Sequence, residues 1–547
     1  MTAGSESAES LSEQVTPTGH SVLSTQYSVL SLWLERATVA CLFLYALAAP
    51  HSIAGTQTAW LLAMLFWVAR LCVRPRTVLF RTPVDPWLLG FFVLTFLTAL
   101  TSYNPEVSIG KLRAASLFTV VYVAAENVRS PKVLRALVLT LVASCALGVV
   151  HTFVTYARGR GVKIRAMASD SPLRGVGFLE GDTILSVDGA EVRTPEDVVR
   201  AVESERPTRG ERAYRFPDGK VACRWDERTA CVRVYRAELL PTGNLARDAL
   251  PPGATPEARL GIQSWTRGRD ERASGFYGQY QTYAEMLQLV ASLALGMLIS
   301  LRRKLSMKGA LLGLALASLV AALLLTVTRA SWAGFLVSAF TIALVGASRR
   351  TLLITAAVAL PLVVAGLLVL QQKRQVGFID TKEGSTAWRL IVWQEGARIL
   401  VSKPRHLLVG VGMDSLKRRW REWGMFDQGR QPWGHLHSTP LQLAFERGVP
   451  ALLVWAGWLF VYGRMLWRLA RGGLKGEWVE RGLILGALGG LVGFVSAGLV
   501  HYNFGDSEVV MVFYLVMGLA LAAERLGRRG EPWAAPVRIE SGCEEGN

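Results

Sequence analysis

Residues 308–348 read KGALLGLALASLVAALLLTVTRASWAGFLVSAFTIALVGAS. As a single α-helix this run would extend over roughly 60 Å, about twice the thickness of the hydrocarbon core of a bilayer. The chain must therefore turn within it, and the only polar interruption is Thr328-Arg329-Ala330-Ser331. The stretch predicts two membrane-spanning helices joined by a tight turn, with Arg329 at the tip of the hairpin.

The rest of the chain repeats such apolar runs. Its 547 residues are 51% hydrophobic, and the mean hydropathy is +0.30. A soluble protein rarely tolerates repeated apolar runs of about 18 residues or more, whereas a bilayer requires them. The sequence therefore predicts an all-α polytopic membrane protein with about twelve transmembrane helices, near residues 34–54, 57–73, 85–102, 109–127, 133–156, 283–301, 308–327, 331–348, 351–370, 439–466, 480–501 and 508–525.

The basic residues orient these helices. Lys and Arg concentrate in every second short connection, whereas the alternate connections 50–57 and 501–507 contain neither. Basic short loops stay in the cytoplasm, so both termini are expected there, in a bacterial inner membrane, with the long segments 157–282 and 371–438 in the periplasm. The net charge of +18 fits this topology, and no nucleic-acid partner is expected.

The first long segment contains a motif of its own. Ser171-Pro172-Leu173 precedes Gly175–Gly189 (GVGFLEGDTILSVDG), where Gly-Asp and Asp-Gly pairs make turns flanking a strand, and a short helix follows at Pro195–Val202. This pattern resembles a bacterial periplasmic PDZ domain. The resemblance implies docking of a peptide or protein partner by strand addition. The alternative is a spacer that shapes the periplasmic face.

Two cysteines lie in the same segment. Cys223 and Cys231 are eight residues apart, in two predicted strands, Lys220–Trp225 and Thr229–Tyr235. Cross-strand cysteines usually pair in an oxidising compartment, which predicts a disulfide; the alternative is two free buried thiols.

The expected organisation is a disordered cytoplasmic tail at 1–33, helices one to five at 34–156, the small α/β PDZ-like insertion at 157–245, a linker at 246–282, helices six to nine at 283–370, a large periplasmic loop at 371–438, helices ten to twelve at 439–525 and a cytoplasmic tail at 526–547.

The second long segment carries a dense series of polar motifs. In chain order these are Trp388-Arg389-Leu390, the glycine turn Val409–Met413, the basic run Lys417–Arg421, His437-Ser438-Thr439-Pro440 and Glu446-Arg447-Gly448. An Arg-Trp helix, a Gly-x-Gly turn and a His that opens a helix with Glu-x-Gly behind it resemble the O-antigen ligase and polymerase family. The Arg329 hairpin, and Arg272 ahead of the sixth span, resemble it too. Two departures are Ser438, where the family commonly has Asn, and the PDZ-like insert.

The resemblance implies a GT-C-like membrane fold that transfers a glycan from undecaprenyl diphosphate. The residue types suit this chemistry. A diphosphate leaving group needs neutralising, which planar, permanently charged arginines do, and the acceptor hydroxyl needs a base, for which His is suited near neutral pH. Arg329, Arg389 and Arg272 are the predicted diphosphate ligands, and His437 is the predicted base.

Position strengthens the assignment of His437. Ser438 or Thr439 suits a helix cap and Pro440 a first turn, so His437 should lie at the positive end of a helix, which attracts a diphosphate and disfavours imidazolium. Glu446 is the second predicted catalytic residue, orienting His437; otherwise it is a charge near the helix start. His435 competes for the role of base.

Structural interpretations exist for each of these residues. His437 suits an interfacial helix cap, Arg329 suits snorkelling to headgroups, and Arg389 suits a surface salt bridge. The run Lys417–Arg421 suits a solvated or headgroup-facing surface, although an anionic acceptor could bind there. Asp506 and Glu508 are a weak metal signal and better suited to capping a helix. No cofactor and no metal are expected, and the enzyme is expected to be metal-independent.

The leading hypothesis is an O-antigen ligase-like glycosyltransferase that acts on a periplasmic acceptor such as lipid A-core. The alternative within the class is an O-antigen or exopolysaccharide polymerase that joins carrier-linked repeat units. A transporter would place ionisable residues in mid-span, whereas the candidates here cluster at one face. A PDZ-bearing scaffold is the third possibility. The expected partners are the undecaprenyl-diphosphate-linked glycan, a lipid or glycan acceptor, the lipid bilayer and a peptide or protein at the PDZ-like domain.

Overall fold

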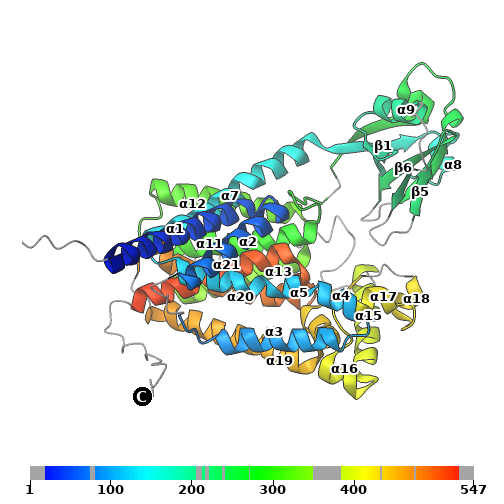
Figure 1. Ribbon diagram of the computed structural model, residues 1–547. Helices are drawn as coiled ribbons and strands as arrows, with labels where there is room; N and C mark the ends of the chain where they lie inside the picture. The colour runs from blue at the N-terminus through cyan, green and yellow to red at the C-terminus, as the bar shows by residue number, and fades with distance from the viewer. Residues whose placement is uncertain are drawn as a thin grey trace, which may run out of the picture. The chain divides into compact units, whose positions relative to one another are not determined.

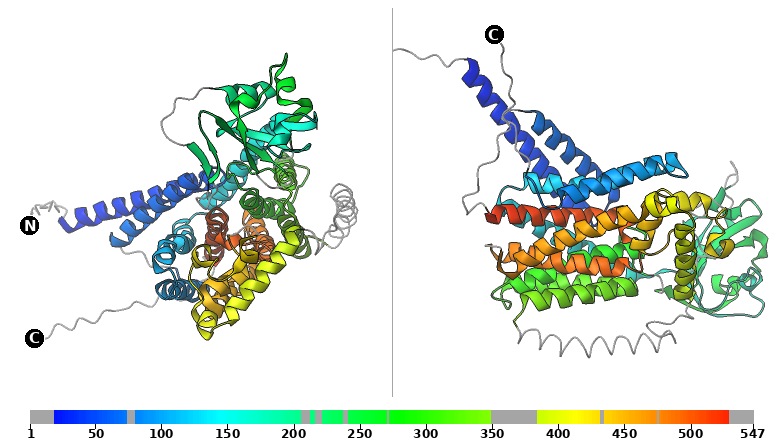
Figure 2. Two further views of the ribbon diagram at one scale, coloured as in Figure 1. Left: turned by 90° about the vertical axis from the view of Figure 1, so that its right-hand side faces the viewer. Right: turned by 90° about the horizontal axis from the view of Figure 1, so that it is seen from below.

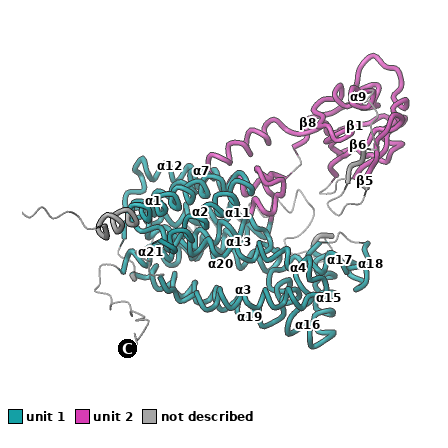
Figure 3. The backbone as a smooth tube through the Cα atoms, in the orientation of Figure 1, with its two compact units in different colours: residues 1–145, 285–320, 329–547 teal, residues 146–284, 321–328 magenta. Residues whose placement is uncertain are grey.

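The computed structural model describes residues 19–73, 80–204, 212–215, 221–236, 241–269, 272–348, 384–430, 434–473 and 476–528. The chain divides into two compact units (Figure 3): unit 1 comprises residues 1–145, 285–320 and 329–547, and unit 2 comprises residues 146–284 and 321–328.

The turn predicted near Arg329 is confirmed. Helix α12 (Met307–Leu325) and helix α13 (Arg329–Gly346) are separated by three residues, of which Val327 has a φ of +52°. Arg329 is the first residue of α13. The 41-residue run is therefore two spans and not one.

Nine helical segments in the described part of the chain are long and apolar enough to cross a membrane. The predicted polytopic, mostly α-helical class is correct. The nine segments are Val29–Ala48, Pro105–Asn127, Pro131–Arg158, Tyr280–Ser300, Met307–Leu325, Arg329–Gly346, Thr439–Gly472, Trp478–Gly498 and Ser507–Arg528. Two further predicted runs are helices α2 (Ile53–Cys72) and the shorter α3 (Asp85–Leu100), while the run predicted at 351–370 lies outside the described residues.

Helix α1 (Gly19–Ala48) corrects one predicted boundary. The segment 1–33 was expected to be a disordered tail because it is rich in Ser and Thr, yet the helix begins at Gly19. A helix that has formed adds residues at little cost, so the apolar run can extend backwards into a polar segment.

Helix α20 (Trp478–Gly498) is packed closely by its neighbours (Figures 1 and 2). A Cβ added at Gly493 would lie 2.5 Å from the carbonyl oxygen of Gly334 on α13, and one at Gly486 would lie 2.6 Å from Cα of Leu293 on α11 (Tyr280–Ser300). Small residues let membrane helices approach to backbone contact. The glycines of α20 thus allow α11 and α13 to pack against its backbone in the middle of the bundle.

Arginines of the predicted basic connections form ion pairs at one end of unit 1. Arg70 and Arg129, from different connections, both pair with Glu35. Arg135 pairs with Glu480 at 2.6 Å, at the start of α20. Arg468, from the end of α19 (Thr439–Arg468), shares Glu524 with Arg528 of α21 (Ser507–Arg528). The first residue of α19, Thr439, therefore lies at the other end of the bundle.

Unit 2 contains the predicted small α/β insertion. Its main sheet has the order β7-β6-β2-β1-β8, with β3 paired to β2, and β4 and β5 form a separate pair. All strand pairs are antiparallel. The strands are β1 (Arg160–Met167), β2 (Thr183–Val187), β3 (Ala190–Glu191), β4 (Arg212–Arg215), β5 (Val221–Trp225), β6 (Thr229–Tyr235), β7 (Thr242–Ala246) and β8 (Ile262–Gly268).

The helices and the disulfide complete unit 2. Val198 and Val202, on the helix α9 (Pro195–Glu203), pack in the same core as Ile184 of β2. Cys223 of β5 and Cys231 of β6 form a disulfide, with their Cα atoms 5.7 Å apart.

The sheet extends beyond the predicted end of the insert. Strand β8 lies in the segment 246–282, which was expected to be a linker, and pairs along β1 from Arg160↔Gly268 to Met167↔Ile262. Four of the seven residues of Ile262–Gly268 are polar and the last is glycine, so the composition alone gives only a weak strand signal. Its partner, at the far end of the insert, supplies the hydrogen bonds that make it a strand.

Candidate active site

A break in helix α19 creates the site. Gly448 has a φ of +82° inside the helix, and Pro450 follows. Since Pro450 has no N–H, it cannot bond the carbonyl of Glu446 as a regular helix requires. The glycine turn supplies the missing donors: Val411 N–H donates to the carbonyl of Phe445, and Gly412 N–H donates to that of Glu446, both at 2.9 Å.

This arrangement requires glycine on both sides. A Cβ at Gly448 would lie 2.3 Å from the carbonyl oxygen of Leu408, and one at Gly410 would lie 2.4 Å from the carbonyl carbon of Glu446. The Gly-x-Gly turn and the Glu-x-Gly motif, noted separately in the sequence, are thus two halves of one packing contact.

The Glu446 carboxylate is held by three donors. Gln442 Nε2 and the N–H of Asp414 donate to its Oε1 at 2.8 and 3.1 Å, and the hydroxyl of Tyr502 donates to Oε2 at 3.2 Å. Glu446 is buried, with 2% of its surface exposed. A buried carboxylate needs such partners, so its orientation is fixed. His437 is not among these donors, so in the described part of the chain Glu446 does not orient His437 through a direct hydrogen bond.

The loop before α19 is fixed in a strained conformation. His437 has a φ of +49°, which side-chain-bearing residues rarely adopt. Gln442 Oε1 accepts the N–H of Leu436 at 2.7 Å, and Trp393 Nε1 donates to the carbonyl of Leu436 at 2.8 Å. Gln442 therefore joins the histidine loop to Glu446. Pro440 lies in the first turn as predicted, whereas Ser438, at the N-cap, makes no side-chain capping bond.

Two histidines of this loop contact each other. The ring centroids of His435 and His437 are 3.9 Å apart, and the backbone N–H of His437 donates to Nδ1 of His435 at 3.2 Å. Nδ1 of His435 is thus an acceptor. On its other side His437 packs edge-on against Trp388 of α15 (Gly384–Val401), with 4.5 Å between centroids, and its Nδ1 has no hydrogen-bond partner among the described residues.

The surroundings keep both rings neutral. Burial lowers the pKa of His435 to about 4, helped by the positive charge of Lys417. Burial lowers the pKa of His437 even further below its usual value, and His435, His501 and Arg389 act in the same direction. A neutral imidazole can accept a proton, so either ring is chemically suited to act as a base.

A cavity of about 180 Å³ lies beside this loop. Its lining includes His435, Glu446 and Tyr502 but not His437. Of the two histidines, the structure therefore places His435 at the cavity, while His437 lies against Trp388. The remaining lining residues with polar or charged side chains are Lys111, Asp414, Lys417, Arg447, Asp506, Ser507 and Tyr514.

Arg447 is the residue that sequence reasoning missed. It lines the cavity with 7% of its surface exposed, and its Nε and Nη1 atoms have no hydrogen-bond partner in the described part of the chain. Its other contacts are Nη2 to Sδ of Met413 at 3.3 Å and the ring of Phe91 at 5.4 Å. A buried, incompletely bonded guanidinium is costly and is suited to bind an anion. The feature of the sequence that could have indicated Arg447 is its position between Glu446 and Gly448.

Two lysines flank the cavity. Nζ of Lys111 lies 2.7 Å from Asp414, and Nζ of Lys417 lies 3.1 Å from the same carboxylate. Burial alone would raise the pKa of Asp414, but these two lysines hold it below its usual value. Lys417 thus belongs to the cavity, whereas the run Lys417–Arg421 was interpreted chiefly as a solvated surface.

The predicted diphosphate ligands have separate surroundings. Arg389 lies on α15 one residue from Trp388, close enough for its charge to lower the pKa of both His435 and His437. Arg329 opens α13, two residues before Ser331. Ser331 Oγ donates to Oε1 of Glu285 at 3.2 Å.

A buried network connects the start of α13 to the start of α19. Glu285 also contacts His501 Nδ1 at 3.0 Å and accepts from Asn503 Nδ2 at 3.3 Å. The Thr439 hydroxyl lies 2.9 Å from Oδ1 of Asn503, and Thr439 N–H donates to the carbonyl of His501. The first residues of both helices are therefore tied to the same short segment, 501–503.

Arg272 belongs to unit 2. Its guanidinium stacks over the ring of Tyr280 at 4.5 Å, and it lines a different cavity. Arg329, Arg389, His437 and Glu446, by contrast, all belong to unit 1. Among the described residues, no group of three His, Cys, Asp or Glu side chains could hold a metal ion.

Comparison with known protein families finds a match over part of this site. The O-antigen ligase family model matches residues 314–456, a stretch that begins in α12 and includes Arg329, Arg389, His437 and the break of α19. No curated protein matches the chain. Residues 314–456 are therefore similar to the O-antigen ligase family.

Proposed function

We propose that this protein is an O-antigen ligase-like glycosyltransferase, which moves a glycan from undecaprenyl diphosphate to a periplasmic acceptor such as lipid A-core. The observation that carries the proposal is the buried Arg447 guanidinium, with two unpartnered nitrogens, in a cavity also lined by His435 and Glu446. The similarity of residues 314–456 to the O-antigen ligase family supports glycan transfer as the general activity.

The proposed reaction needs two kinds of group. A bond forms between the acceptor oxygen and the anomeric carbon of the donor, and the bond from that carbon to the diphosphate breaks. The acceptor proton passes to a neutral imidazole, and the electron pair leaves on the diphosphate, whose charge arginines stabilise. This scheme is independent of metal.

His437 is the proposed base, as the sequence analysis assigned it, and His435 is the competing residue. The low pKa of each ring leaves it unprotonated at neutral pH. In favour of His437 are its unpartnered Nδ1 and its strained backbone, since strain concentrates at functional positions. In favour of His435 is its place in the cavity wall.

Arg447 joins Arg389 and Arg329, which also belong to unit 1, as a proposed ligand of the diphosphate; the assignment of Arg272, in unit 2, stays a prediction from the sequence. Glu446 is proposed to position Tyr502 and the turn at Asp414, since it bonds both. The proposed orientation puts the cavity on the periplasmic side of the inner membrane and both termini in the cytoplasm. Peptide docking at the insert is a separate prediction that the transfer reaction does not need.

Transfer by the purified protein tests the activity. The full-length chain in detergent is given a lipid-linked glycan and lipid A-core, and the product is separated by electrophoresis. Product that depends on both substrates supports the proposal. A well-folded preparation that makes no product with either acceptor class, lipid A-core or a second carrier-linked unit, would contradict it.

The glycan profile of a deletion strain separates the two activities of the class. Loss of a ligase leaves long chains on the carrier, whereas loss of a polymerase leaves single repeat units. The proposal expects long chains on the carrier. Accumulation of single units would instead establish the polymerase.

A further inference from the structure

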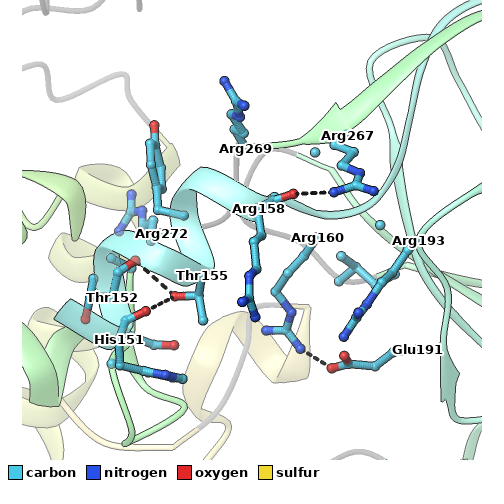
Figure 4. A pocket seen from close by; sticks show the side chains of 18 of the residues that line it. His151, Thr152, Thr155, Arg158, Arg160, Glu191, Arg193, Arg267, Arg269 and Arg272 are labelled. Carbon is cyan, nitrogen blue, oxygen red and sulfur yellow. Dashed lines mark hydrogen bonds and ion pairs between the residues drawn. The ribbon is translucent and has the colours of Figure 1, made fainter. Parts of the chain in front are cut away.

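Unit 2 contains a second cavity, of about 410 Å³, with a lining unlike that of the first (Figure 4). Among the described residues it is lined by six arginines and one acidic residue, Glu191. The arginines are Arg158, Arg160, Arg193, Arg267, Arg269 and Arg272. Like charges packed around one hollow repel each other unless an anion neutralises them.

The sheet topology explains how the arginines meet. Antiparallel pairing of β1 with β8 sets Arg160 opposite Gly268 and Val162 opposite Arg267. The sequences Arg158-Gly159-Arg160 and Arg267-Gly268-Arg269, far apart in the chain, are thereby brought together at the point where the insert begins and ends. The glycines between them are required, since a Cβ at Gly268 would lie 2.4 Å from Cγ2 of Thr183.

Several of these charges are available to a ligand. Arg160 pairs with Glu191, and Arg267 and Arg269 donate to the carbonyls of Arg158 and Ala157 at 3.3 and 3.2 Å. The guanidinium groups of Arg158 and Arg193 make no hydrogen bond or ion pair with any described residue. Figure 4 shows the side chains of Arg158, Arg160 and Arg193 extending in the same direction.

We propose that this cavity binds the phosphate group of an anionic lipid. Arginines match phosphate oxygens with paired N–H donors, which makes phosphate the best-suited anion. The lipid origin follows from α7 (Pro131–Arg158), which has 28 residues and is a candidate span. At 1.5 Å per residue it measures roughly 42 Å, longer than the hydrocarbon core of about 30 Å, so an end of the helix reaches the level of the headgroups.

A peptide fits this site less well. A peptide that binds by strand addition needs the length of an edge strand, here β7 or β8, whereas the arginines lie at the ends of β1 and β8 and on the chain that leads to and from them. The inference does not rest on the proposed function, because three of the six arginines belong to the predicted insert, three to the segment 246–282, and none lines the cavity beside α19.

Binding to the full-length protein in nonionic detergent tests the proposal. The probes are phosphatidic acid in mixed micelles, phosphatidylcholine as the uncharged comparison and inorganic pyrophosphate as a free phosphate source. Phosphatidic acid should bind more tightly than pyrophosphate, phosphatidylcholine should not compete, and binding should weaken with salt. Binding of pyrophosphate alone would overturn the lipid assignment, and no binding of either would overturn the site.

Two matched double variants locate the binding. Arg158→Ser with Arg193→Ser should weaken phosphatidic acid binding by about tenfold or more. Arg165→Ser with Arg200→Ser removes the same charge elsewhere in the module, where Arg165 donates to Thr266 and Arg200 pairs with Glu196, and should weaken it by less than about twofold. If both double variants lose phosphatidic acid binding equally, the binding depends only on the net charge of the module, and the proposed site is wrong.

A third double guards against misfolding. Arg158→Lys with Arg193→Lys retains both charges and should keep binding within about threefold to fivefold of the unmodified protein, because it loses only the paired geometry. Loss of binding by this variant together with an unchanged thermal unfolding temperature would mean that the planar guanidinium is essential. Unchanged binding by the serine double would again contradict the proposal.

Discussion

The two cavities of this protein both collect positive charge, but they do so in opposite ways. Beside α19, the two acidic groups Glu446 and Asp414 have fixed partners, three donors and two lysines respectively, and two histidines are held neutral. In unit 2, six arginines surround a larger hollow with one carboxylate among the described lining residues. The first arrangement is suited to a reaction and the second to holding a charged group.

The difference teaches what burial does to a charge. Arg447 is 7% exposed and lacks partners for two nitrogens, so it contributes a strong field from a single residue. Arg160, in the wall of the cavity of unit 2, is more open, with 47% of its side chain exposed. Solvent weakens exposed charges, and many are then needed for the same effect.

The largest effect is expected from His437→Ala. Removing a general base should lower the rate of glycan transfer by about 10²–10⁴-fold. His435→Gln, which removes the other ring but keeps a hydrogen-bonding side chain, should cost less than about tenfold. Initial rates with saturating donor measure both, with the thermal unfolding temperature as the control for folding. The reverse ranking would transfer the role of base to His435.

Arg447→Met separates catalysis from stability. Transfer should fall by about 10²–10³-fold, because the developing charge on the diphosphate loses its buried donor. The unfolding temperature should stay the same or rise, since an unpaired buried charge is costly.

Arg70→Met is the matched control. Arg70 is 4% exposed but pairs with Glu35 and donates to Asn127 at 3.0 Å, so its loss should destabilise the protein by about 3–5 kcal/mol. An unfolding temperature that drops as far in Arg447→Met as in Arg70→Met would show that Arg447 is structural.

The neutral histidines predict how stability depends on pH. The pKa of His435 is about 4 in the folded protein, below the value of about 6.5 expected when unfolded. Between these values the unfolded chain binds the additional proton, so stability is full above pH 6.5 and falls as the pH drops towards 4. The loss attributable to His435 should reach about 3 kcal/mol.

Thermal unfolding from pH 8 to pH 4 measures this loss, with His435→Gln as the comparison. The variant should lose less stability on acidification than the unmodified protein. Identical pH profiles for the two proteins would mean that His435 is protonated in the folded state, and the contrast between a neutral cavity and a charged one would fail.

The smallest effect is expected from removing the disulfide. Cys223→Ser with Cys231→Ser opens a loop closed by a sequence separation of eight residues, which should cost unit 2 about 2–3 kcal/mol. Transfer by the protein should be unchanged within about twofold, because both cysteines belong to unit 2 and the proposed catalytic residues to unit 1. Hydrogen exchange in the strands of the insert reports the local loss. A matching loss of protection in α19 would mean that the two regions unfold together.

The sequence predicted the helices well because membrane spans depend on length and apolarity, which are local properties. The turn at Arg329 followed from the length of one apolar run. Strand β8 was missed because its character depends on pairing with β1, about a hundred residues earlier, rather than on its own composition.

The sequence predicted several residues of the candidate site but few of the contacts between them. His437, Glu446 and Arg389 come from motifs, and the structure places all of them around α15 and the start of α19. That His435 rather than His437 lines the cavity was not predicted, because the sequence does not specify the conformation of the loop before α19, in which His437 has a positive φ. Arg447 was overlooked because a buried arginine cannot be told from an exposed one before the break at Gly448 is seen.

The pairing of β1 with β8 also bears on how the protein was assembled. Arg160 and Gly268 are direct partners, so the insert leaves the membrane domain and returns to it at almost the same point. A gene segment that encodes a module with adjacent ends can enter an existing coding sequence without displacing the flanking helices. The same property makes the module removable: joining residue 158 to residue 269 through a short glycine linker would delete the strands of the insert, which gives a shortened protein for comparison with the full-length chain.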